Sequence, residues 1–161
     1  MDDKAGRVGA VLRNRGQTLA VAESLTGGLL ASAFARAAAA SDWFQGGVIA
    51  YASSVKHDLL GVPPGPVVSP AAAAAMARGA ASVLKATVAV AVTGVGGPGS
   101  QDGQPPGTVW VGTWPAELGD PVWLQLDGSP ESICQQACSQ AAHLLLERLG
   151  DSNELRPRCS G

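Results

Sequence analysis

The stretch with the most evident chemistry is 21–28, which reads Val-Ala-Glu-Ser-Leu-Thr-Gly-Gly. An apolar run ends here in polar residues, with hydroxyls at Ser24 and Thr26. Gly27 and Gly28 then precede a segment whose apolar residues have helical spacing, so we predict a strand, a tight glycine turn and a helix amino terminus. Unpaired backbone N–H groups at such a terminus carry the positive end of the helix dipole. The turn therefore suits an anion or a developing oxyanion.

Ser24 could act as a nucleophile if a nearby base took its proton. The chain has three lysines and one tyrosine, and Lys56 follows Tyr51 by five residues at the end of another predicted strand. A lysine with a lowered pKa can accept a proton from a serine, and a tyrosine can relay or orient that proton. The glycine turn would then donate N–H groups to the oxyanion. From spacing alone, a capping serine, a solvated lysine and a core tyrosine are the simpler interpretation. Glu23 either orients Lys56 or has no partner.

A second glycine-rich stretch follows the most apolar run of the chain, residues 87–92. Its candidate ligand-binding residues are Thr93, Gly94, Gly97 and Gly99. Glycines let backbone N–H groups approach a ligand closely, although a plain turn between strands is the alternative. The spacing fits neither the phosphate loop of nucleotide triphosphatases nor a dinucleotide motif. The two histidines, His57 and His143, do not favour a Ser-His-Asp triad.

The remaining pattern predicts the elements that position these residues. We expect helices over 3–15, 29–40, 53–60, 70–84 and 130–149, and strands over 18–22, 48–51, 87–92, 107–114 and 121–126. Strands that alternate with helices and end in a hairpin predict an α/β fold, a three-layer α/β/α sandwich with a mixed, mostly parallel sheet. The ligand site should lie where strands end in glycine loops, at the edge that carries Ser24 and Thr93. We expect one domain over 1–150 and a disordered tail over 151–161.

Composition narrows the class of protein. The net charge is −2 and the basic residues are scattered, so we expect no nucleic-acid partner. No apolar run approaches the roughly 20 residues of a membrane span, and no signal peptide pattern is present, so we expect no membrane partner and a cytoplasmic location. Cys134, Cys138 and His143 could supply part of a metal site, but buried small thiols are the better interpretation. The alanine-rich helices leave a homo-oligomer open.

Seven motifs stand in order along residues 5–149. They are Ala22-Glu23-Ser24-x-Thr26-Gly27-Gly28-Leu29-Leu30-Ala31, Phe44-x-Gly46-Gly47-Val48-Ile49-x-Tyr51, Lys56-x-x-Leu59-Leu60-Gly61-Val62, Val68-Ser69, Met76-Ala77-x-Gly79-Ala80, Thr93-Gly94-x-x-Gly97-Pro98-Gly99 and Gly107-Thr108-Val109. Together they resemble the carboxy-terminal domain of the CinA competence/damage-inducible proteins. Since longer CinA proteins have a separate amino-terminal domain with no counterpart here, the resemblance implies the stand-alone form.

The resemblance implies an α/β/α fold and a nicotinamide-nucleotide amidohydrolase. This enzyme deamidates nicotinamide mononucleotide to nicotinate mononucleotide and ammonia, in pyridine-nucleotide recycling, with no metal or dissociable cofactor. Ser24 would be the nucleophile, with Tyr51 and Lys56 as its activating partners. The residues implied to hold the nucleotide substrate and its phosphate are Thr26, Gly27, Gly28, Thr93, Gly94, Gly97 and Gly99.

The chain departs from the family pattern at several positions. Leu25 replaces a usual cysteine and Pro70 a usual glutamate, and neither change need affect chemistry. The last helix lacks two arginines, where this chain has Pro130 and Cys134, and Gln104 stands where a lysine is common. Loss of one charged hydrogen bond would weaken phosphate binding by roughly ten- to a hundredfold or more. Two alternatives therefore stand beside deamidation: a nucleotide-binding module with little or no catalysis, and an amidase for another small amide.

Overall fold

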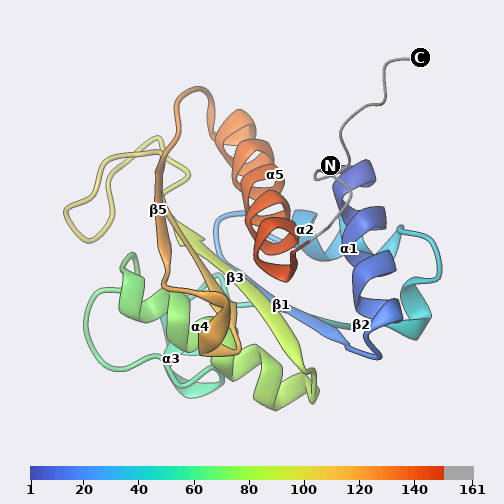
Figure 1. The fold of residues 1–161 in the computed structure, drawn as a ribbon. Coiled ribbons are helices and arrows are strands. Elements are labelled where there is room, and N and C mark those ends of the chain that lie inside the picture. The colour runs from blue at the N-terminus through green and yellow to red at the C-terminus, as the bar shows by residue number, and fades with distance from the viewer. Residues whose placement is uncertain (151–161) are drawn as a thin grey trace.

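The fold is a three-layer α/β/α sandwich, seen here in a computed structural model that describes residues 1–150 (Figure 1). In chain order its elements are α1 (Asp2–Asn14), β1 (Leu19–Glu23), α2 (Leu29–Ala35), η1 (Ala40–Asp42), β2 (Phe44–Ile49), α3 (Ser53–Asp58), α4 (Pro70–Leu84), β3 (Val88–Gly94), β4 (Thr108–Trp114), η2 (Ala116–Leu118), β5 (Val122–Gln125) and α5 (Pro130–Leu149). The sheet order is β2-β1-β3-β4-β5. β2, β1 and β3 pair in parallel, and β4 is antiparallel to both its neighbours, so only β4 runs in the reverse direction. The predicted fold class is confirmed.

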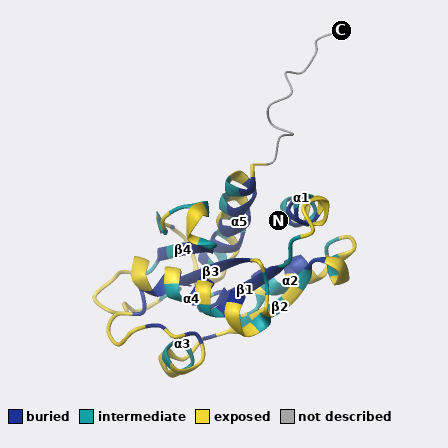
Figure 2. Cartoon of the chain, turned by 60° about the horizontal axis from the view of Figure 1, so that its bottom comes forward, coloured by how far each residue is buried: buried dark blue, intermediate teal, exposed yellow. Residues whose placement is uncertain are grey.

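The two faces of the sheet bury side chains of different size. Leu19 and Val21 of β1 face a core shared with α1, α2 and α5, whereas Ala20 and Ala22 face the alanine-rich α4. β3 alternates in the same way, with valines toward the first core and alanines toward the second. Figure 2 shows both strands buried between the helical layers. Small side chains on one face therefore let α4 lie close to the sheet.

Two glycines make the close approach of α4 possible. A Cβ built on Gly112 of β4 would lie 2.4 Å from the carbonyl oxygen of Ala73, and one on Gly79 would lie 2.2 Å from that of Leu60. Real Cβ atoms do not come so near to a backbone oxygen, so any side chain at either position would push α4 away. In this chain, the glycine of the motif Met76-Ala77-x-Gly79-Ala80 therefore has a packing role.

The predicted starts of two long helices are confirmed by their caps. The Ser69 hydroxyl accepts a hydrogen bond from the Ala72 N–H (3.1 Å), and the Ser129 hydroxyl accepts one from the Ser132 N–H (3.2 Å). In both helices a proline occupies the first turn, where its missing N–H costs nothing. Within residues 1–150, none of the helices combines the length and apolar character needed to cross a membrane.

Two predicted boundaries are wrong. The helix predicted over 29–40 ends at Ala35. The chain then turns through Ala39, at φ 54°, so that Trp43 can fill the core at 1% exposure. The strand predicted over 48–51 begins four residues earlier and ends at Ile49. Gly47 lies within this strand, where a Cβ would lie 2.7 Å from Val21 Cγ2, so the glycine serves packing and not a turn.

Candidate active site

The carboxyl ends of β1, β2 and β3 meet at one edge of the sheet. Glu23, the last residue of β1, pairs with Ile49 of β2 and with Val92 of β3. Ser24 follows Glu23, and Thr93 follows Val92, so both lie at the edge where the sequence places a ligand site. Tyr51 comes two residues after β2, and the Ala50 N–H continues the ladder by donating to the Glu23 carbonyl oxygen (2.7 Å).

Glu23 organises the glycine turn from inside the protein. Its side chain is fully buried, and Oε1 accepts hydrogen bonds from the Thr26 hydroxyl (2.7 Å) and the Leu30 N–H (2.9 Å). Oε2 accepts a third bond from the Ala31 N–H (2.9 Å). The carboxylate thus satisfies first-turn amides of α2 and lies at the positive end of that helix. Neither alternative for Glu23 holds, since its partners are the turn and α2 and not Lys56.

This arrangement corrects part of the predicted oxyanion site. The Gly27 N–H donates to the Ser24 carbonyl oxygen (3.1 Å), so it closes the turn and is not free for a ligand. Gly27 and Gly28 have φ angles of 56° and 108°, a left-handed backbone that favours glycine. Of the N–H groups of Gly27 and Gly28, only that of Gly28 can therefore donate to an oxyanion, as far as residues 1–150 show.

The surroundings of Ser24, Lys56 and Tyr51 exclude the ordinary structural roles that spacing alone suggests. The residue that caps α2 is Gly28, without a side-chain hydrogen bond, so Ser24 is not the cap. Lys56 is 1% exposed and therefore is not a solvated lysine. Tyr51 is 72% exposed and therefore is not a core tyrosine.

Burial changes the acidity of Lys56. Desolvation lowers the pKa of its ammonium, and the negative charge of Asp102 opposes that shift more weakly. Its Nζ donates to the backbone carbonyl of Tyr51 (3.2 Å), which holds it at the strand edge. The contact uses the carbonyl of Tyr51 and not the phenol. Within residues 1–150 no hydrogen bond joins Lys56 Nζ to Ser24 Oγ.

Thr93 and the glycine-rich loop are tied to the segment 62–69. The buried Thr93 hydroxyl donates to the Val67 carbonyl oxygen (2.6 Å), so it braces the backbone and does not point a free proton at a ligand. Asp102 Oδ2 accepts from the N–H groups of Val67 (2.8 Å) and Val68 (3.0 Å). Our sequence reasoning missed Asp102. The Asp-Gly pair at 102–103, a common signal for a tight hairpin turn, could have drawn attention to it.

Cys134 lies against the turn that carries Ser24. Its Sγ–H donates to the Leu25 carbonyl oxygen (3.1 Å), so the position where the family pattern has an arginine borders the candidate site. Burial raises the pKa of Cys134, and burial with the charges of Glu23 and Cys134 raises the pKa of Cys138 to about 12. Both thiols are therefore neutral near pH 7. Residues 1–150 contain no group of three or more His, Cys, Asp or Glu side chains arranged to hold a metal ion.

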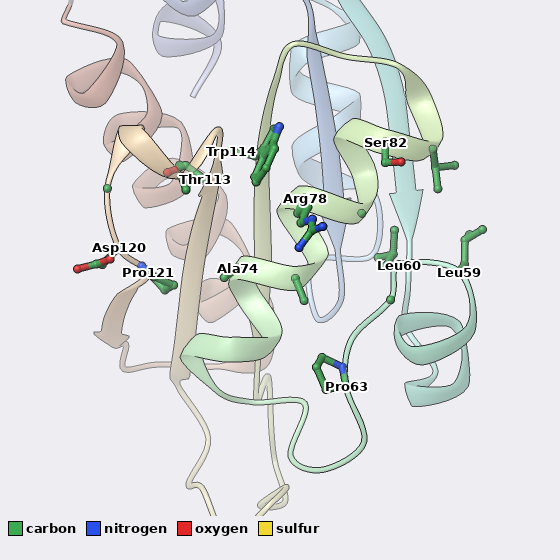
Figure 3. Close-up of a pocket in the computed structure, with 16 residues that line it drawn as sticks. Leu59, Leu60, Pro63, Ala74, Arg78, Ser82, Thr113, Trp114, Asp120 and Pro121 are labelled. Carbon is green, nitrogen blue, oxygen red and sulfur yellow. The ribbon is translucent and has the colours of Figure 1, made fainter.

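A separate hollow of about 680 Å³ lies over α4 (Figure 3). Arg78 projects into it, with its guanidinium 6.0 Å from the centre of the Trp114 ring. None of the predicted site residues lines this hollow. Trp114 pairs with Ala89 near the start of β3, at the other end of that strand from Thr93.

Comparison with known proteins decides the family. The profile of the "CinA C-terminal domain" matches residues 1–149. The chain belongs to the CinA family. Among solved structures, a CinA superfamily protein from Klebsiella pneumoniae has a TM-score of 0.86 and 31% identity, covering 92% of this chain and 96% of that one. A CinA superfamily protein from Escherichia coli has the same TM-score and identity, with 91% of this chain and 88% of that one covered.

Curated relatives of this CinA-family chain are longer than it is. A CinA-like protein from Synechocystis sp. is 47% identical over 152 residues, which are 91% of this chain and 32% of the relative. A putative competence-damage inducible protein from Halalkalibacterium halodurans is 36% identical over 149 residues, 89% of this chain and 36% of the relative. The chain thus spans about a third of these relatives. The family resemblance drawn from the seven motifs is confirmed.

Proposed function

We propose that this chain is an amidohydrolase that converts nicotinamide mononucleotide to nicotinate mononucleotide and ammonia. The supporting observation is the burial of Lys56 at the sheet edge that carries Ser24. A buried lysine with a lowered pKa is costly to keep in a fold, and such groups gather where a base is needed. Membership of the CinA family supports the fold and the position of the site, whereas the reaction itself is our proposal.

The proposed reaction begins with attack of Ser24 Oγ on the carboxamide carbon of the substrate. Neutral Lys56 accepts the serine proton, and the Gly28 N–H donates to the oxyanion of the tetrahedral intermediate. Lys56 then gives that proton to the departing nitrogen, which leaves as ammonia. Water, deprotonated by Lys56, cleaves the ester on Ser24 and restores the hydroxyl. Since Lys56 Nζ is now bound to the Tyr51 carbonyl, it must turn toward Ser24 when substrate binds, as apo catalytic contacts often tighten.

A second candidate function is hydrolysis of another small amide that lacks a phosphate. The observation that favours it is the neutral thiol of Cys134 beside the glycine turn, where the family resemblance implies an arginine. Without that charge, a substrate phosphate lacks a strong partner there. The amide chemistry at Ser24 does not depend on a cation at position 134. A nucleotide-binding module with little or no catalysis stays the remaining alternative.

The test is ammonia release from purified protein with nicotinamide mononucleotide as substrate. The Ser24→Ala variant should lose the activity, while Ser82→Ala, an exposed serine on α4, serves as the matched control and should keep it. Full activity in folded Ser24→Ala would contradict the nucleophile assignment. Binding of the nucleotide without ammonia release would favour the binding module. Equal turnover of nicotinamide riboside and its phosphate would favour the other amide.

A further inference from the structure

Asp102 stands at the tip of a tight turn within the glycine-rich loop. Gln101 and Gln104 exchange two backbone hydrogen bonds of 3.1 and 2.8 Å across this turn. Its two central residues, Asp102 and Gly103, have φ angles of 52° and 71°. Gly103 adopts a positive φ at no steric cost, but Asp102 does so at a cost that most residues avoid. The turn therefore fixes the backbone conformation from which the Asp102 side chain extends.

The carboxylate at the turn joins three segments that are distant in the chain. Asp102 Oδ2 accepts two convergent N–H groups from the consecutive residues Val67 and Val68. The carbonyl of Val67 in turn accepts the Thr93 hydroxyl at the end of β3. One carboxylate oxygen thus fastens the glycine-rich loop to the segment before α4, and Thr93 fastens that segment to the sheet.

Asp102 also acts electrostatically on Lys56. Its negative charge favours the protonated form of the Lys56 ammonium, against the larger and opposite effect of burial on the pKa of that group. The neighbours of Lys56 within α3 do not compete: the His57 ring is bound to the Val62 carbonyl oxygen (2.8 Å), and the Asp58 side chain is exposed to solvent. The turn at Asp102 therefore has an electrostatic influence on Lys56, the candidate base.

We propose that Asp102 is a positioning residue of the candidate active site, which fastens the glycine-rich loop to residues 67–68 and, through Val67, to Thr93 at the end of β3. This inference rests on the proposed function, because it takes the sheet edge that carries Ser24 and Thr93 as the active site. Asp102 touches no reacting atom. It sets the shape of the loop through the Val67 and Val68 amides, and its charge is a smaller influence on Lys56 than burial is.

Two substitutions separate the parts of this proposal. Asp102→Asn keeps an oxygen acceptor and tolerates the positive φ, but removes the charge. It should leave the loop closed and move both the Lys56 titration and the acid limb of the kcat/KM profile to lower pH. Asp102→Gly keeps the backbone conformation but removes both acceptor and charge. It should speed hydrogen exchange at the Val67 and Val68 amides at least tenfold and raise KM for the nucleotide.

Two of these measurements need no substrate, so they stay informative if the proposed function fails. Lys56 is titrated by NMR of ¹³C-labelled lysine, which is simple because the chain has only three lysines, and amide exchange is followed by NMR. Asp58→Asn is the matched control: it removes an exposed carboxylate from α3 and should not move the Lys56 titration. Unchanged exchange in folded Asp102→Gly would overturn the proposal. Faster exchange in Asp102→Gly, with no ammonia release from the unaltered protein, would instead count against deamidation alone.

Discussion

Replacing Glu23 with glutamine is expected to destabilise the turn that carries Ser24. The carboxylate accepts three hydrogen bonds in a fully buried site, two at Oε1 and one at Oε2. A glutamine can offer its oxygen at only one of these positions. In the better orientation it keeps the bonds from Thr26 and Leu30, and its NH₂ group then faces the Ala31 N–H, so two donors meet and neither is satisfied.

The loss of stability expected for Glu23→Gln follows from the one hydrogen bond that the glutamine cannot make. Loss of one bond to a charged acceptor, with a buried donor left unpaired, destabilises a protein by about 1.5–3 kcal/mol. Urea unfolding followed by tryptophan fluorescence measures this cost, since Trp43 is buried in the core beside α2. With a typical slope, the midpoint should fall by ~1 M urea.

The matched control is Glu131→Gln, an exposed glutamate in the first turn of α5. It should change stability by no more than about 0.5 kcal/mol. A Glu23→Gln protein as stable as the control would refute the reasoning that Glu23 holds the turn through three bonds. Glu23→Gln should also lose much of its kcat, because displacement of the turn moves Ser24.

Three further predictions concern residues around the same edge. Cys134→Arg should lower KM for nicotinamide mononucleotide by roughly tenfold or more, because it adds a cation beside the turn, whereas Cys134→Met should not. Equal KM values for the two variants in initial-rate assays would contradict this prediction. Lys56→Met should abolish activity yet raise the free energy of unfolding at pH 7, because it removes an amine whose charged form burial disfavours. Burial lowers the pKa of Lys56 from its ordinary 10.5, so the gain measured in denaturant titrations should shrink as the pH approaches that value. The pKa of Cys138 is raised to about 12 from an ordinary value of about 9, so the unfolded state loses its proton first, and stability should fall as pH rises from 9 to 12. Cys138→Ala should show a shallower fall across that range, and identical slopes would argue against the buried neutral thiol.

The sequence alone determined what depends on local pattern. Ser69-Pro70 and Ser129-Pro130 predicted two helix starts correctly, because a hydroxyl cap and a first-turn proline act within four residues. The unbroken apolar run before Thr93 predicted the central strand, which is buried on both faces. The order of seven motifs predicted the family, and the placement of Ser24 at a strand end before a glycine turn followed from the change of hydrophobic period.

Only the tertiary structure decided what depends on contacts between distant segments. Gly46 and Gly47 precede the strand predicted over 48–51, but both lie within β2, and Val21 and Ala31 leave no room for a Cβ at Gly47. Burial of Lys56, exposure of Tyr51 and the partners of Glu23 could not be read from spacing, since a charged side chain gives no local sign of what packs over it. The bond from Asp102 to Val67 spans 35 residues. It exists because the sheet brings the glycine-rich loop and the segment before α4 to the same edge, and no local pattern encodes that meeting.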